Sequence, residues 1–124
     1  MTHQEIDTFE KLHSQLISFH TELTSLSKKE QNGPVNEFKL RFINALISKI
    51  NSVLGEKYRP FEDFAQFDSD TLPSNSDVTM ILGQYLGCME KMRADNIFIK
   101  SAQWYWRSGE QETNIKTSAP QKIK

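Results

Sequence analysis

An apolar stripe near the start of the chain restricts its fold more than any other feature. Between residues 9 and 26, large apolar residues recur at alternating spacings of three and four: Phe9, Leu12, Leu16, Phe19, Leu23 and Leu26. This heptad spacing places the side chains on one face of a helix, and the residues between them are mostly polar. The stripe therefore predicts a long amphipathic helix over residues 3 to about 30, which must bury this face against other elements.

A second helix is predicted from about Pro34 to Leu54. Its apolar residues form a face wider than a coiled-coil seam, which favours contact with two neighbours: Phe38, Phe42, Ile43, Leu46, Ile47, Ile50, Val53 and Leu54. Gly33 and Pro34 separate the two helices, because glycine often ends one helix and proline often begins the next. The short connection predicts an antiparallel helical hairpin.

Residues 58–76 have a different composition. Three phenylalanines recur at every third position after Pro60, which indicates a short helix, and the turn-forming residues from 68 onward indicate a loop. A third long helix is predicted from about Asp77 to Arg107, with a bend near Asn96. The alternative for residues 97–106 is a short β-hairpin, because β-branched and aromatic residues are frequent there.

The last part of the chain, residues 110–124, is polar and lacks an apolar stripe, which predicts a disordered tail. Residues 1–109 then form a single helical domain. The predicted fold class is all-α: an antiparallel helical hairpin plus a third long helix, in a three- to four-helix bundle. Eight residues are expected to meet in the core: Leu16, Phe19, Phe42, Leu46, Ile50, Leu82, Tyr85 and Met89.

Composition excludes several classes of protein. A net charge of −1 excludes a uniformly basic nucleic-acid-binding protein. The sequence has no run of about 18 apolar residues, so we expect no membrane association, and its polar, acidic start does not resemble a secretory signal. Cys88 is the single cysteine, which excludes an intramolecular disulfide and indicates a reducing, cytoplasmic location.

Signatures of catalysis are also absent from the sequence. It contains no phosphate-binding glycine loop, no nucleophile elbow and no paired-histidine zinc motif. His13 and His20 are seven residues apart, about 10 Å along a helix, which is too far to share a metal ion. We therefore expect a protein that is not an enzyme and that holds no cofactor and no metal.

The strongest candidate for a binding surface is basic and aromatic. Residues 93–124 include six basic and three acidic side chains, and Arg107 directly follows Trp106. On a helix, Trp104 and Trp106 are about 200° apart, so both cannot face one core. At least one tryptophan is then expected at an interface, where Trp and Arg are favoured. The predicted partner-binding residues are Trp104, Trp106 and Arg107, with Tyr58 and Arg59 as neighbours.

An alternative surface is acidic. Residues 56–77 contain six acids against Lys57 and Arg59, and the acids predicted to form this surface are Glu62, Asp63, Asp68 and Asp70. The spacing does not fit a calcium-binding loop, because Leu72 stands where a third ligand would be needed. A solvated acidic loop that attracts a basic partner is the better interpretation.

Gly83 and Gly87 are unusual inside a helix, where each costs roughly 1 kcal/mol relative to alanine. Either a close helix crossing within the chain or a seam between two copies would explain them. The sequence as a whole predicts a small soluble interaction protein: an accessory subunit, adaptor or inhibitor that binds a protein partner. The alternative is a nucleic-acid-binding subunit, and a homo-oligomer is compatible with either.

Overall fold

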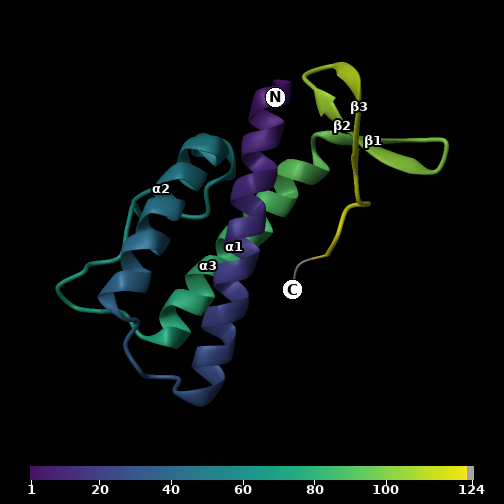
Figure 1. The fold of residues 1–124 in the computed structure, drawn as a ribbon. Coiled ribbons are helices and arrows are strands. Elements are labelled where there is room, and N and C mark those ends of the chain that lie inside the picture. Colours follow the sequence, from purple (N-terminus) through teal and green to yellow (C-terminus); the bar gives the residue numbers. More distant parts are fainter. Residues whose placement is uncertain (123–124) are drawn as a thin grey trace.

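The computed structural model describes residues 1–122. Within this range, three helices precede a three-stranded sheet: α1 (His3–Lys29), α2 (Glu37–Tyr58), α3 (Asn75–Ala94), β1 (Ile97–Lys100), β2 (Gln103–Ser108) and β3 (Gln111–Thr117) (Figure 1). The prediction of an all-α helical bundle is therefore wrong, because the last part of the chain forms an antiparallel sheet in the order β1-β2-β3.

The predicted long first helix is confirmed, and α1 has the expected bounds. Thr2 caps its start: the Thr2 hydroxyl accepts a hydrogen bond from the Glu5 backbone, and the Glu5 carboxylate accepts one from the Thr2 backbone. This reciprocal capping box satisfies two backbone donors that a helix start otherwise leaves unpaired. The apolar stripe faces inward, although Phe19 and Leu26 are only partly buried.

The second helix lies antiparallel to α1 (Figure 1). α2 begins after the capping residue Asn36, whose side chain accepts from the Lys39 backbone, and not at Pro34 as predicted. It continues past the expected end to Tyr58, with a kink at Gly55, where φ is 63°. This left-handed conformation is readily accessible only to glycine, which explains why the chain bends there.

Residues 59–74 form an extended connection and not the predicted short helix at 60–67. The connection runs back along α2 to the start of α3, where the Ser74 hydroxyl accepts a hydrogen bond from the Asp77 backbone (Figure 1). Phe61, Phe64 and Phe67 contact one another edge to face along this connection, with ring centroids 6.2 and 5.0 Å apart. Aromatic contacts therefore order this segment in place of a helix.

The third helix ends at Ala94, and its predicted continuation to Arg107 is wrong. The alternative of a hairpin over residues 97–106 is confirmed: Ile97 pairs with Trp106 and Lys100 with Gln103. The predicted disordered tail is wrong for Gln111–Thr117, which form β3. Residues 123 and 124, also part of that predicted tail, lie outside the described residues.

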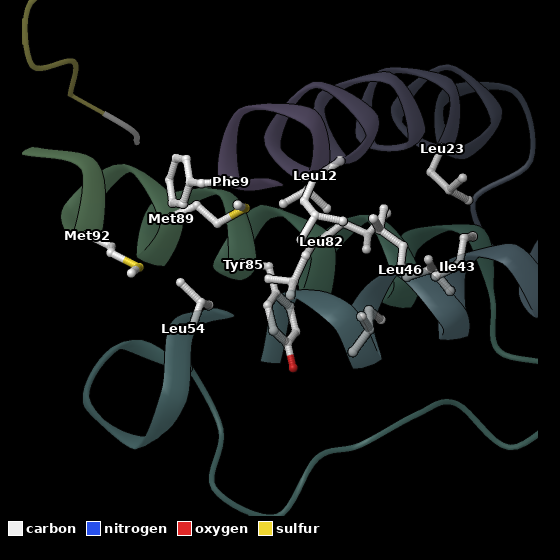
Figure 2. Close-up of a cluster of buried hydrophobic side chains, with 14 of the residues drawn as sticks. Phe9, Leu12, Leu23, Ile43, Leu46, Leu54, Leu82, Tyr85, Met89 and Met92 are labelled. Carbon is white, nitrogen blue, oxygen red and sulfur yellow. The ribbon is translucent and has the colours of Figure 1, made fainter. Parts of the chain in front are cut away.

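The main core lies between the three helices, and Figure 2 shows side chains from each of them meeting there. Six of the eight predicted core residues are buried in it: Leu16, Leu46, Ile50, Leu82, Tyr85 and Met89. The prediction is wrong for Phe42, which is 46% exposed. The sheet extends this core, because the Trp106 ring packs against Phe9 of α1 with their centroids 5.2 Å apart.

Candidate functional site

The strand geometry removes the reason for expecting an exposed tryptophan. Successive side chains on a strand point to opposite faces, so Trp104 and Trp106 lie on the same face of β2. Trp106 is fully buried against the helices, and Trp104 is partly buried beside the same core. The angular separation expected on a helix does not apply here. The proposed binding role of the two rings stays a prediction, but its geometric basis was wrong.

The other predicted partner-binding residues do not gather around the tryptophans. Arg107 lies on the opposite face of β2, with its guanidinium 5.1 Å from the Phe98 ring centroid. The Tyr58 hydroxyl donates to Asp95 at 2.8 Å, and partial burial together with this carboxylate raises the pKa of Tyr58. Arg59 reaches back to the Asn51 carbonyl at 3.5 Å. These contacts lie at three separate places: within the sheet for Arg107, between the ends of α2 and α3 for Tyr58, and against α2 for Arg59.

The predicted acidic residues all lie exposed on the 59–74 connection. Asp68 organises a tight turn by accepting hydrogen bonds from the Asp70 backbone and the Thr71 hydroxyl. Glu62 and Asp63 line a shallow depression with Phe61, Phe64 and Ile81, whereas Asp68 and Asp70 flank Ser69 at a different site. The acidic surface is therefore divided into two parts.

Ser69 lines the largest hollow described in the molecule, a groove of about 750 Å³ between α2 and the 59–74 connection. One wall is the outer face of α2 and the other is the turn around Phe67. Ten residues line it: Glu37, Phe38, Leu40, Arg41, Asn44, Ala45, Ser48, Gln66, Phe67 and Ser69. We call it the α2 groove.

Asn44 fixes the two walls of the α2 groove to each other. Its side-chain amide donates to the Phe67 carbonyl at 3.0 Å, and its side-chain oxygen accepts from the Phe67 backbone at 2.8 Å. This paired hydrogen bond joins a helix to a connection 23 residues further along the chain. The groove is therefore preformed by the fold and does not depend on a ligand to bring its walls together.

An exposed aromatic pair begins at one end of the α2 groove: Phe38 lines the groove, and Phe42, which does not line it, packs against Phe38. Phe38 is 65% and Phe42 46% exposed, and their rings meet edge to face with centroids 5.1 Å apart. The Arg41 guanidinium lies over both rings, 5.4 Å from Phe38 and 5.2 Å from Phe42. Sequence reasoning missed this cluster because it assigned both phenylalanines to the apolar face of the helix.

A second, smaller cavity of about 250 Å³ lies between α1, α3 and the end of β3. It contains a buried ion pair in which the Arg93 guanidinium donates to both Glu90 oxygens, at 2.7 and 2.8 Å. Despite burial, the hydrogen bonds from Arg93 and Gln121 lower the pKa of Glu90. Nearby His13 is partly buried, and this burial lowers its pKa.

The polar groups of the ion pair are used within the chain, whereas the buried indole N–H of Trp106, which also lines this cavity, has no hydrogen-bond partner among the described residues. Arg93 also donates to the Thr117 hydroxyl and to the Ser118 and Ala119 carbonyls, at 2.8–2.9 Å, and the Gln121 backbone donates to Glu90 at 2.7 Å. Every N–H of the Arg93 guanidinium thus donates a hydrogen bond either to Glu90 or to the C-terminal segment, residues 117–121. The arrangement fastens this segment to α3 and leaves no free charge in the ion pair for a ligand.

The cysteine and the helical glycines also have definite environments. Cys88 is partly buried, and burial raises the pKa of its thiol, which disfavours the nucleophilic thiolate. An added Cβ at Gly87 would meet nothing within 4 Å, and one at Gly83 would meet the His20 imidazole at 3.5 Å. The close helix crossing expected at these glycines is therefore not found within the described chain.

Metal binding and membrane insertion find no support in residues 1–122. No group of three or more His, Cys, Asp or Glu side chains there is placed to hold a metal ion. No helix among these residues has the length and hydrophobicity needed to cross a membrane. No protein-family profile, curated protein or solved structure matches the chain. Its function must therefore be inferred from its own residues.

Proposed function

We propose that this chain is a small interaction protein, an accessory subunit, adaptor or inhibitor, that binds a protein partner through the α2 groove. The observation that supports this most strongly is the Phe38–Phe42 pair at the groove end. Each of these phenylalanines leaves about half of its side chain or more in contact with water in the isolated chain, and an exposed apolar patch of this kind typically marks an interface.

The residue types support the same proposal. Aromatic residues and arginine are enriched in the few positions that dominate binding energy between proteins. Arg41 offers both its charge and a planar surface, which the two rings hold in place. Leu40 and Phe67 supply apolar lining deeper in the groove, and Gln66 and Ser69 supply a polar rim. An apolar centre with a polar rim is the usual anatomy of a protein interface.

Affinity capture from extracts of the native cell tests this proposal. The wild-type chain is compared with a Phe38→Ala/Phe42→Ala double variant, each with and without nuclease. We expect a partner that survives nuclease and is lost in the double variant, because truncating such anchors typically costs about 2 kcal/mol or more each. Ile99→Ala is the matched control, since Ile99 is 57% exposed but lies on β1.

Two results would contradict the proposal. A partner retained equally by the double variant would place the binding surface elsewhere on the molecule. A partner lost on nuclease treatment would favour the nucleic-acid alternative, for which Tyr105, Arg107 and Lys116 on one face of the sheet would be the residues to change next.

A further inference from the structure

We infer that the α2 groove receives an amphipathic helix whose flanking residues are basic. This inference rests on the proposed function and names the chemistry of the partner at the same site. It follows from three properties of the groove: the character of its walls, its length along α2 and the distribution of charge around it.

The walls favour a helix over an extended peptide. An extended segment needs backbone donors and acceptors along its path, as an exposed sheet edge provides. One wall of the groove is α2, whose backbone groups are paired within the helix, and Asn44 already occupies the backbone of Phe67 in the other wall. A helical partner satisfies its own backbone and needs only side-chain contacts.

The shape of the α2 face suits such a partner. Glu37 and Ser48, at the two ends of the lining, are separated by about 17 Å along the helix axis, which matches three turns of a second helix. Along this face the lining side chains become smaller, from Phe38 and Arg41 near one end to Ala45 and Ser48 at the other. Small side chains at one end let a helix approach closely, and the aromatic pair at the other end meets its larger apolar residues.

The charge around the groove selects a basic partner. From residue 60 to residue 90 the chain contains six acidic side chains and no lysine, arginine or histidine. Asp68 and Asp70 are exposed on either side of Ser69 at the rim, and Glu37 lies on the opposite wall. Glu37 and Arg41 both line the α2 wall, so three carboxylates stand against the one guanidinium of Arg41, while Lys39 is engaged with Glu22 at 3.0 Å. Charge of one sign at a rim steers and orients a partner of the other.

The test uses two synthetic 16-residue helical peptides of identical apolar pattern, with leucine at positions i, i+3, i+4 and i+7. One peptide carries lysine on its polar face and the other carries glutamate at the same positions. Binding to the isotope-labelled full chain is followed by amide chemical-shift changes. We expect the lysine peptide to shift residues 37–48 and 66–70, and to bind at least tenfold more tightly than the glutamate peptide at low salt.

Charge variants connect this preference to the rim. Asp68→Asn/Asp70→Asn is expected to remove most of the tenfold preference and to weaken its salt dependence. An asparagine at position 68 keeps a side-chain oxygen that can accept the bond from the residue 70 backbone, so the turn stays ordered. Glu62→Gln/Asp63→Asn is the matched control: it removes two charges from the same connection, but these residues line the separate depression around Phe61 and Phe64 and do not flank the groove residue Ser69.

Three outcomes would overturn the inference, and they differ in what they leave standing. Equal binding of both peptides at the groove would remove the preference for basic residues but retain the proposed function. Concentration-dependent shifts of groove residues without any peptide would identify a second copy of this chain as the occupant. Shifts that avoid the groove altogether, with either peptide, would remove the proposed site as well.

Discussion

Phe42 and Leu46 lie one turn apart on α2, but the fold uses them in opposite ways. Leu46 is buried between the helices, whereas Phe42 faces the solvent beside Phe38. Both positions fit an apolar helical pattern, and an apolar pattern alone does not distinguish a core face from a binding face. The difference between the two positions can be measured as the change in the free energy of unfolding when each side chain is truncated.

Leu46→Ala should lower the free energy of unfolding by about 2–5 kcal/mol, because it removes a buried side chain and leaves a cavity. Phe42→Ala should change it by less than about 1 kcal/mol, because the ring already meets water. Chemical denaturation of the two variants provides the comparison. Similar losses for both would show that Phe42 belongs to the core and would remove it from the proposed site.

His13 makes stability depend on pH. Burial is the main cause that lowers its pKa in the folded protein, and Arg93 acts in the same direction, while Glu90 opposes them. A depressed folded pKa gives a stabilising contribution that is complete above the unfolded pKa of about 6.5 and is lost as the pH falls toward the folded value. The pKa of His20 is also lowered, again because the side chain is partly buried.

We therefore expect the free energy of unfolding to fall between about pH 7 and pH 5, and to fall less steeply in His13→Gln. Denaturant titrations over that range measure the slope. His3→Gln is the control, because His3 is exposed at the start of α1. A slope in His13→Gln equal to that of the wild type would show that the folded chain does not disfavour protonation of His13.

At the scale of elements, the turn between β1 and β2 explains why the sheet was hard to predict. It consists of Ser101 and Ala102, whose φ angles are 52° and 64°. A two-residue hairpin turn of this kind usually contains asparagine or glycine, since other residues are strained at positive φ. Without that signal, the apolar residues of 97–106 fit a helix as well as a strand. The second turn, in contrast, contains Gly109 at a φ of 64°.

Replacing Ser101 by Asn and Ala102 by Gly should stabilise the chain by roughly 1–2 kcal/mol, because both new residues tolerate a left-handed conformation. The midpoint of thermal unfolding of the double variant provides the measurement. A lower midpoint than that of the wild type would show that this turn does not have the described geometry.

The helices were predictable because several local signals agreed for each one. α1 has its apolar stripe and an acidic residue at its start, and α3 has the capping serine Ser74. The α2 groove was not predictable in the same way. It requires Asn44 to meet Phe67, which is 23 residues away, and no local pattern indicates this pairing.

At the scale of the whole molecule, residues 111–121 are part of the folded structure. β3 pairs with β2, and residues 117–121 are bonded to the buried Glu90–Arg93 pair. A buried ion pair is costly unless its remaining hydrogen-bonding groups are satisfied, and the C-terminal segment satisfies them. The segment therefore stabilises a pair that would otherwise be incompletely bonded.

Deleting residues 110–124 should lower the midpoint of thermal unfolding by several degrees, because it removes a strand and exposes the ion pair. Deleting only 118–124 keeps β3 and should have a smaller effect of the same sign. Calorimetry on the two truncated chains separates these contributions. An unchanged midpoint in the longer deletion would show that residues 110–124 add no stability, as expected for the disordered tail predicted from their composition.

Binding of a protein partner at the exposed end of the α2 groove is tested most directly by photo-cross-linking. A photoreactive phenylalanine analogue replaces Phe38 in one version of the full chain and Ile99 in another, and both are irradiated in the native cell. We expect a discrete protein cross-linked from position 38 and absent from position 99. Cross-links to the same protein from position 99 and not from position 38 would contradict binding at this groove.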